Sequence, residues 1–580
     1  MIQQETFVSL LEIQYGMRKN NMKIKVIGNR HKAHEELLKR NISERIPVCF
    51  GEEGLRIELR INKRIGKAES FRISKQSEGY KITGADSEGL CYGIGKFLHT
   101  AKWTEKDFEP NPPMDLQTPD SSLRAIYFAI HYNNWYDEAP AEDLDKYLEE
   151  LLLYGYNAII GVIPTNGIYS YEKHLFERSV QKLRSMFILA KRLGMKVGII
   201  ITSNAGLLDA PHEWDADPSY EQRPEKPVRG HLGRNLCPNI PEALEYLRGL
   251  WLEKLERFTD IGIDYFVSWP YDGGGCGCEK CRPWGANGFC DMSIAVHNDI
   301  VKYYPDSKFI LATWLYDSPD DEGEYSGLYE RLKGDMSFVD YIMADSHDTF
   351  PKYPLEHEPV KPIINFPEIS MWRLVPWGGR GANPQPKRFQ AIWDGAKHVL
   401  KGGMPYSEGK YEDVLKVQYA GYYWDADKSY KEILGEYVNY EFSGDVVDEV
   451  VEMMELMELN HVRVADHLDP DMDAIKRCEQ LADYVDAKLG ERAKTSWRWR
   501  ILYIRAKMDR ITNTLYFEKY YDTKDAIRRV KFTPEEWLYD NEEAQELMQE
   551  LCRLYCCVDL RDDKQNAPTL PTVRDGKVIR

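Results

Sequence analysis

Short apolar runs alternate with longer amphipathic segments through the middle of the chain. The apolar runs are rich in β-branched and aromatic residues, which is typical of buried strands. The runs that we predict as strands are 123–130, 157–163, 196–202, 264–267, 308–313, 339–343, 362–366 and 403–406. Amphipathic segments predicted as helices separate most of them, among them 141–154, 177–192, 241–259 and 388–400. Eight strand–helix units within about 300 residues predict an α/β fold, a (β/α)8 TIM barrel, whereas doubly wound sheets usually have about five or six strands.

The pattern differs before this region. Residues 22–118 combine strand-like runs at 23–28 and 55–61 with a short helical segment at 34–40. A strand, a glycine-rich turn and a helix beginning near Gly89 follow within 78–98, and the glycine spacing matches no nucleotide-binding motif. We therefore predict an N-terminal α+β domain over 22–118, joined by a proline-rich linker to a catalytic barrel over 119–425.

The pattern changes again after the barrel. Long helical periodicity without strands occupies 430–442, 446–460, 472–489 and 496–521, and the polar end of the chain, 564–580, is expected to be extended. These segments predict an all-helical C-terminal domain over 426–580. We expect this domain to buttress the barrel, and it is a candidate for closing the site or for forming a homo-oligomer face.

Charge and cysteine usage exclude some classes of partner. The net charge of −18 argues against a nucleic-acid surface or an anionic-membrane surface, because both need a basic face. No apolar run approaches the roughly 20 residues of a membrane helix, and no secretory signal is visible. Eleven cysteines, four of them clustered and the others scattered, suit a reducing compartment better than a disulfide framework. We expect a cytoplasmic protein.

The predicted strand ends carry aromatic rings, carboxylates and amides. In a TIM barrel, groups at the C-terminal ends of the strands face the active site. Apolar sugar faces stack on aromatic rings, and carboxylates supply acid, base and hydroxyl-binding groups. The predicted substrate-binding residues are His131, Asn134, Trp135, Trp269, Tyr271, Trp314, His347, Trp372, Arg373 and Tyr406. We expect His131, Trp135, Trp314 and Trp372 to line one pocket for a terminal sugar.

Acids follow four of the strands, and a catalytic pair is expected among Asp272, Asp345, Glu368 and Glu408. Any one of these acids could instead cap a helix or pair with a nearby arginine. We predict Asp272 as the general acid, because Trp269 and Tyr271 could desolvate it and raise its pKa. We predict Glu368 as the opposing base or nucleophile, kept ionised by Arg373. Asp345 and Glu408 are alternatives for this second role.

Several motifs resemble glycoside hydrolases. The pattern Glu78-Gly-Tyr, Ile82-Thr-Gly-Ala-Asp and Gly89-Leu-Cys-Tyr-Gly resembles the domain that precedes the barrel in family 20 hexosaminidases and family 67 α-glucuronidases. The segments that begin at Asn235, Ser268 and Tyr406 resemble motifs of a poorly characterised group of glycosidase-like TIM barrels. Families 20 and 84 carry two adjacent acids after strand four, whereas Asp272 is flanked by Tyr271 and Gly273. The pattern therefore resembles family 67 more closely.

Four cysteines follow the fourth strand at C-x-C-x2-C-x8-C spacing. Cys276, Cys278, Cys281 and Cys290 have ligand spacing for a tetrahedral structural Zn²⁺, and Cys237 is a possible substitute ligand. The alternatives are four reduced cysteines or a catalytic zinc, although all-thiolate sites are usually closed to substrate. A structural zinc would hold the glycine-rich loop that carries Asp272. We expect no cofactor for catalysis.

The sequence and the resemblance together predict an exo-acting glycoside hydrolase. It would remove terminal sugars, with a uronide or a hexosaminide favoured, from an oligosaccharide or other glycoside by a carboxylate-pair mechanism. Two other functions stay open at this point. One is a zinc-dependent sugar hydrolase such as a deacetylase, and the other is a barrel that binds a glycan without turning it over.

Overall fold

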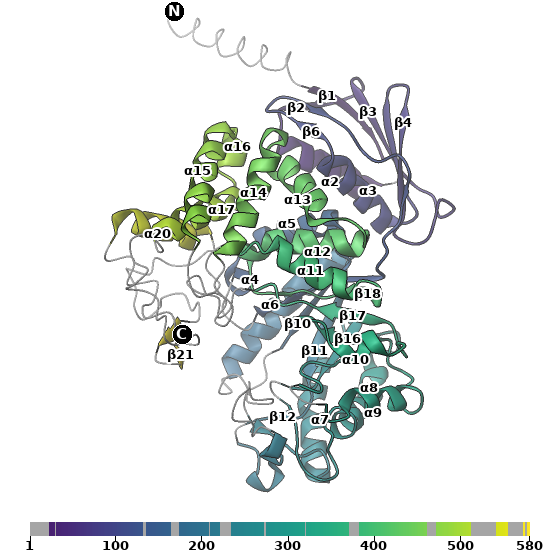
Figure 1. Ribbon diagram of the computed structural model, residues 1–580. Helices are drawn as coiled ribbons and strands as arrows, with labels where there is room; N and C mark the ends of the chain where they lie inside the picture. Colours follow the sequence, from purple (N-terminus) through teal and green to yellow (C-terminus); the bar gives the residue numbers. More distant parts are fainter. Residues whose placement is uncertain are drawn as a thin grey trace, which may run out of the picture.

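The protein is a closed barrel, and its N-terminal sheet region and C-terminal helices lie next to each other against it (Figure 1). The computed structural model describes residues 22–28, 31–130, 135–163, 173–207, 209–220, 234–271, 274–318, 321–347, 349–370, 382–460, 471–511, 541–554, 572–574 and 577–579.

The barrel sheet is parallel throughout, and each of its strands overlaps a predicted one. Its strands are β9 (Leu123–Phe128), β10 (Ala158–Val162), β11 (Lys196–Thr202), β14 (Tyr265–Trp269), β15 (Lys308–Ala312), β16 (Tyr341–Asp345), β17 (Ile363–Phe366), β18 (Leu400–Gly403) and the short β19 (Tyr406–Ser407). From β9 to β18 each strand pairs with the next, and β9 pairs on its other edge with both β18 and β19. The sheet therefore closes, and the predicted TIM barrel is confirmed.

Helices connect the strands on the outside of the barrel. They are α4 (Trp135–Glu138), α5 (Ala141–Tyr154), α6 (Lys173–Arg192), α7 (Pro241–Glu256), α8 (Gly288–Tyr303), α9 (Glu324–Leu332), α10 (Lys352–Glu356), α11 (Pro386–Ala396) and α12 (Asp413–Trp424). α5 shows why such a segment is helical: acidic residues occupy its first turn, and its leucines are buried on one face. Gly155 ends it with a left-handed φ of 112°, which favours glycine.

The barrel interior is filled by side chains in layers. Leu123, Ile160, Val267, Ile310 and Met343 are buried on the axis, in agreement with the apolar runs of the sequence. Above them, at the C-terminal ends of the strands, the filling becomes aromatic: Tyr127, Trp269, Phe366, Trp314 and Tyr406 pack on one another. The interior is a packed core, so a ligand site can only lie above this aromatic layer.

The N-terminal part is a six-stranded sheet with the order β2-β1-β3-β5-β4-β8. The strands are β1 (Met22–Ile27), β2 (Val48–Phe50), β3 (Leu55–Ile61), β4 (Phe71–Gln76), β5 (Gly79–Gly84) and β8 (Leu116–Gln117); the helices are α2 (Lys32–Ser43) and α3 (Ser87–His99), and a hairpin joins β6 (Lys102–Trp103) to β7 (Phe108–Glu109). Asp86 caps α3 by accepting the Gly89 N–H at 2.8 Å, so the helix begins before the predicted Gly89. A Cβ at Gly95 would lie 2.1 Å from the Leu153 carbonyl oxygen, so this glycine permits close packing of α3 on α5.

The C-terminal part is mainly helical, as predicted. It comprises α13 (Tyr430–Glu441), α14 (Val447–Leu459), α15 (Met472–Lys488), α16 (Glu491–Lys494), α17 (Trp497–Arg510) and α20 (Glu542–Leu554). The expectation of no strand is wrong at the end of the chain, where β20 (Thr572–Arg574) and β21 (Lys577–Ile579) form an antiparallel pair.

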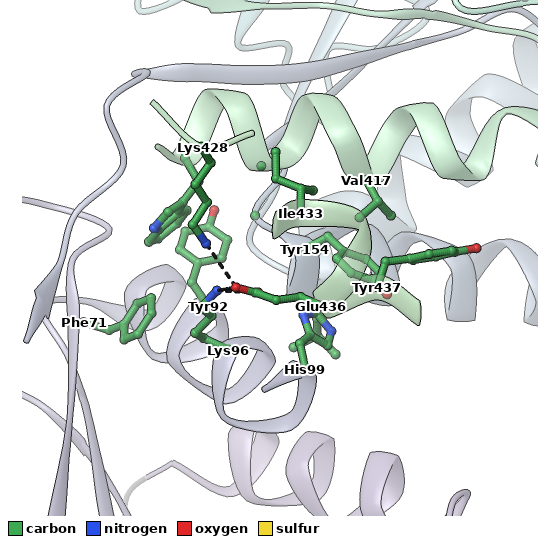
Figure 2. A pocket seen from close by; sticks show the side chains of 14 residues that line it. Phe71, Tyr92, Lys96, His99, Tyr154, Val417, Lys428, Ile433, Glu436 and Tyr437 are labelled. Carbon is green, nitrogen blue, oxygen red and sulfur yellow. Dashed lines mark hydrogen bonds and ion pairs between the residues drawn. The ribbon is translucent and has the colours of Figure 1, made fainter. Parts of the chain in front are cut away.

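A cavity of about 70 Å³ lies where α3 meets α5, α12 and α13 (Figure 2). Glu436 points into it and accepts from Lys96 at 2.7 Å and from Lys428 at 3.1 Å. Gly155 precedes β10 and Trp424 ends α12, so the cavity lies at the N-terminal ends of the barrel strands. It is far smaller than the roughly 300–1,000 Å³ of typical ligand sites. It belongs to the contact between the N-terminal sheet region and the barrel.

Crossing a lipid bilayer takes a helix of about 20 mostly apolar residues. In the ranges given above, none of the helices meets this requirement.

Candidate active site

The structure describes part of the predicted site. Asp272, His131, Asn134, Trp372 and Arg373 lie outside the described residues. Trp135, Trp269, Tyr271, Trp314, Asp345, His347, Glu368, Tyr406 and Glu408 are described, as are the cysteines of the fourth-strand loop.

Four predicted binding residues meet around the aromatic layer at the C-terminal ends of the strands. The ring centroids of Trp269 and Trp314 are 5.9 Å apart, and those of Trp314 and His347 are 5.8 Å apart. Tyr406 reaches the same layer through Phe366, with centroids 5.9 Å apart. We call Trp269, Trp314, Phe366 and Tyr406 the aromatic floor. Residues from four barrel strand ends or the loops after them form it, so the closed barrel itself brings these rings together.

Glu368 stands at the edge of this floor. It follows β17, and its backbone forms a parallel bridge with Tyr406. Its Oε1 accepts the Ser370 N–H at 2.8 Å, and its Oε2 lies 3.9 Å from His347 Nδ1. The side chain keeps 18% of its surface exposed, so it can reach a ligand. Burial and the neighbouring Glu408 carboxyl raise the pKa of Glu368 well above its ordinary value.

Glu408 is the buried neighbour of Glu368. The hydroxyls of Tyr406 and Tyr411 donate to its two carboxyl oxygens at 2.8 and 3.0 Å. Burial and the charge of Glu412 raise the pKa of Glu408 to about 8, although the two hydroxyls oppose the shift. Two carboxyls with raised pKa values therefore sit side by side at the ends of strands seven and eight. At neutral pH such a couple holds at least one proton.

Glu412 and Lys416 are a buried support that the sequence analysis missed. Glu412 accepts the Glu408 N–H at 2.8 Å and the Ser407 hydroxyl, which fixes the turn that carries Glu408. Lys416 lies 3.9 Å from Glu412 and donates to the Tyr147 hydroxyl at 2.9 Å. Burial raises the pKa of Glu412 to about 7 and lowers that of Lys416 to about 8. The four-residue spacing of Glu412 and Lys416 was the available signal, because it places these two side chains on one side of a helical turn.

Asp345 ends β16, the strand next to β17. Its Oδ1 accepts the N–H of His347 at 2.9 Å, so the carboxylate shapes the turn that presents the imidazole to Trp314 and Glu368. This placement gives Asp345 a positioning role toward His347.

Three predicted binding residues are buried: Trp269 lies within the aromatic floor, and Tyr271 and Trp135 pack elsewhere. Tyr271 is 1% exposed and donates to Glu324, which also accepts the Gly285 N–H at 3.0 Å. Trp135 is 3% exposed, and Lys410 lies over its ring at 4.4 Å. Tyr271 supports the fourth-strand loop and Trp135 packs beneath Lys410, and the role of both residues in binding a substrate stays a prediction. The expected four-residue pocket is untested, because His131 and Trp372 lie outside the described residues.

The four cysteines that cluster in the structure are not the four whose spacing was singled out in the sequence. The Sγ atoms of Cys237, Cys276, Cys278 and Cys281 all lie within 4.8 Å of one another. Cys290 is in the first turn of α8, where its thiol donates to the Gly285 carbonyl at 3.2 Å. Burial raises the pKa of Cys290 to about 12, so it stays a neutral thiol. Cys237, named as a substitute, therefore takes the place expected for Cys290.

Comparisons with known proteins relate the chain to others through its fold. No family model matches the chain, and no curated protein matches it. Solved structures do match at low sequence identity. One is a family 115 4-O-methyl-α-glucuronidase with specificity for decorated arabinogalactans (TM-score 0.59, 12% identity, 97% of this chain and 80% of that one). Another is a family 138 glycoside hydrolase that targets the pectin rhamnogalacturonan II (TM-score 0.56, 12% identity, 95% and 94%).

A third match is a family 89 enzyme of Clostridium perfringens, held in complex with its substrate GlcNAc-α-1,4-galactose after two glutamates were changed to glutamine (TM-score 0.57, 10% identity, 91% of this chain and 65% of that one). At sequence identities of 10–12%, these matches show a similar fold and nothing further. The expected resemblance to the barrels of glycoside hydrolases is confirmed at that level.

Proposed function

We propose that the protein is a glycoside hydrolase that removes a terminal sugar from a glycoside or oligosaccharide. The observation that carries this proposal is Glu368, whose protonated form is favoured by burial and by Glu408, beside the aromatic floor at the face of the barrel where TIM-barrel enzymes place their chemistry. Aromatic rings offer stacking faces for a sugar ring, and glycoside cleavage needs a carboxyl that is protonated at working pH together with one that is ionised. The glycoside-hydrolase folds of the three neighbours support the same class.

The mechanism that we propose uses Glu368 and Asp272 as the catalytic pair. Burial and the charge of Glu408 favour the protonated form of Glu368, so Glu368 is our candidate for donating a proton to the leaving oxygen. This reverses the roles expected from the sequence, where Arg373 was to keep Glu368 ionised. Asp272, in the loop after strand four, would then be the ionised partner that acts on the sugar carbon directly or through a water molecule.

We propose a uronide or a hexosaminide as the sugar. The family 115 neighbour acts on a 4-O-methyl-α-glucuronide, and the family 89 neighbour binds a GlcNAc-terminated disaccharide. His347 and the indole N–H of Trp314 border the floor, and the described residues provide no hydrogen-bond acceptor for that N–H. This N–H is itself buried, so a sugar oxygen could accept from it only after a neighbouring side chain moves.

The thiol cluster does not favour a zinc-dependent deacetylase. Four thiols around one point leave no open position for water or substrate, which a catalytic zinc requires.

The test is a screen of aryl glycosides, including uronides and N-acetylhexosaminides, followed by the variants Glu368→Gln and Asp272→Asn. We expect Glu368→Gln to lower kcat/KM about 10²–10⁴-fold on substrates with poor leaving groups and far less on activated aryl glycosides, which need little protonation. Leaving-group dependence in Asp272→Asn instead would overturn the role given to Glu368. Glycan binding without turnover by the wild type, or acetate release alone, would overturn the hydrolase proposal.

A further inference from the structure

We propose that Cys237, Cys276, Cys278 and Cys281 bind one structural Zn²⁺ ion that joins the loops after the third and fourth barrel strands. The four Sγ atoms lie within 4.8 Å of one another, and those of Cys237 and Cys278 are 3.8 Å apart. With a Zn–S distance of about 2.3 Å, a tetrahedral site places its sulfurs about 3.8 Å apart. The spacing of these thiols thus matches a single tetrahedral metal.

The ligands come from two different loops, so the metal would link segments far apart in sequence. Cys237 lies just after β13 (Arg234–Asn235), which pairs with β12 (Ala205–Gly206) in the excursion that follows β11. The other three thiols follow β14. Cys237, Cys276 and Cys281 are buried, so the site is shielded from bulk solvent on most sides.

Two asparagines complete the site as an outer shell. Asn239 Nδ2 donates to Cys281 Sγ at 2.9 Å, which is the contact that stabilises a thiolate ligand. Asn204, fully buried, donates to the Leu236 and Gly275 carbonyls at 2.8 Å each and accepts the Gly275 N–H at 2.8 Å. It therefore holds the residue before Cys237 and the residue before Cys276 at the same time.

The ligand chemistry selects the metal and its role. Four soft thiolates in tetrahedral positions favour Zn²⁺ over the hard, oxygen-seeking Mg²⁺ and Ca²⁺. Binding would deprotonate the thiols and release their protons to solvent. Because all four positions are filled by protein, the ion would hold the loop without taking part in chemistry. The part of the loop so fixed includes Gly275, which Asn204 holds directly before Cys276.

The experiment compares Cys237→Ser with Cys290→Ser in the full chain, purified under reducing conditions without chelator. Elemental analysis is expected to give about one zinc per chain for the wild type and for Cys290→Ser, and at least about tenfold less for Cys237→Ser together with a lower Tm. The pair is matched because both are buried cysteines, and only one is in the cluster. Less than a tenth of an equivalent in the wild type, or loss in Cys290→Ser with retention in Cys237→Ser, would overturn the proposal.

A second measurement covers the case in which Cys237→Ser does not fold. Metal-stripped wild type and Cys290→Ser are titrated with Co²⁺, and the expected result is a sulfur-to-cobalt charge-transfer band that saturates at about one equivalent, with the visible absorption of tetrahedral cobalt. Absence of this band in both proteins would overturn the site. Neither readout depends on glycoside turnover, so failure here and failure of the proposed hydrolase are distinguishable.

Discussion

The pKa of Glu368 depends on the side chain at position 408. Burial alone disfavours the charged form of Glu368, and the Glu408 carboxyl adds repulsion across the gap between strands seven and eight. Glu408 itself is held by the hydroxyls of Tyr406 and Tyr411 and stands next to Glu412. The proton on Glu368 is thus maintained by residues that need not touch the sugar, which makes Glu408 a positioning residue in the proposed mechanism.

Replacing Glu408 with glutamine is therefore expected to shift the pH profile. The change removes the neighbouring charge and lowers the pKa of Glu368, so Glu368 loses its proton at a lower pH. If Glu368 is the proton donor, kcat/KM begins to fall at a lower pH than in the wild type. The pH at which it falls reports the pKa of Glu368 in the free enzyme. The measurement is kcat/KM against pH for the wild type and Glu408→Gln on a substrate with a poor leaving group.

The matched control for this profile is Glu245→Gln, an exposed glutamate on α7 paired with Arg248. It is expected to leave the pH of this fall unchanged. A fall at the same pH in Glu408→Gln as in the wild type, with kcat alone reduced, would mean that the Glu368–Glu408 coupling does not govern the proton.

Side-chain partners were the part of the site that the sequence predicted least well. The C-x-C-x2-C-x8-C spacing favours Cys290 as a ligand, but Cys290 falls in the first turn of α8 and its thiol donates to Gly285. Cys237, far earlier in the sequence, reaches the cluster because β12 and β13 fold its loop back. Spacing along the chain describes local reach only, and the long-range fold decides which thiols meet.

At the scale of elements, Arg498 of α17 binds carboxylates of the barrel helices. Arg498 Nε donates to Asp413 at the start of α12 at 2.8 Å, and Nη2 donates to Glu150 of α5 at 2.8 Å. Tyr147 and Tyr437 also donate to Asp413, at 3.0 and 2.9 Å. Asp413 is therefore the centre of a buried network that joins the C-terminal helices to the barrel.

Arg498→Met should consequently destabilise the protein by about 3–5 kcal/mol, because it leaves buried carboxylates without their cation. Arg477→Met is the control. Arg477 pairs with Glu452 on the surface, with 50% of its side chain exposed against 6% for Arg498, and such pairs are worth about 0–1 kcal/mol. The measurement is urea unfolding followed by the fluorescence of the tryptophans. Equal effects of the two substitutions would show that the network does not hold α17.

The barrel elements were predictable for a physical reason. Each strand is buried on both faces, so its sequence is a short apolar run. A run of this length indicates a strand, because helices are usually longer. The same signal exists for Leu123–Phe128 and for Ile363–Phe366, and both are strands. The final hairpin escaped prediction because β20 and β21 have three residues each and no such run.

At the scale of the whole molecule, Glu441 connects three parts of the chain. It lies 3.2 Å from Arg45, which follows α2, and 3.8 Å from Arg498 of α17, and the Tyr154 hydroxyl of α5 donates to it at 2.9 Å. Although burial opposes ionisation, the charges of Arg498 and Arg45 lower the pKa of Glu441 to about 2. The folded state therefore stabilises the ionised form of Glu441.

This shift sets the direction of a pH effect on stability. A carboxyl with a depressed folded pKa contributes stability above its unfolded pKa of about 4.5, and the contribution is lost as the pH falls toward 2. With 7% of the side chain exposed, the contribution is on the order of 3 kcal/mol. We expect Glu441→Gln to lower the free energy of unfolding by about this amount at pH 7 and by much less near pH 2.

The measurement is urea unfolding of the wild type and Glu441→Gln at several pH values. Glu452→Gln, which removes a carboxyl of the exposed Arg477 pair, is the control and should change little at any pH. A difference between the wild type and Glu441→Gln that is the same at pH 7 and near pH 2 would contradict the linkage.

The barrel sheet can close only late in synthesis, because its first and last strands pair with each other. Leu123 in β9 pairs with Gly402 in β18, so the second edge of the first strand finds its partner only after about 280 further residues have been made. At about 5–20 residues per second, this interval is on the order of 15–60 s. Throughout it, the backbone groups on that edge of Leu123–Phe128 have no neighbouring strand, and unpaired edges invite pairing with other chains. The nascent chain therefore has an unpaired strand edge for about half of its translation, until the eighth strand has been made.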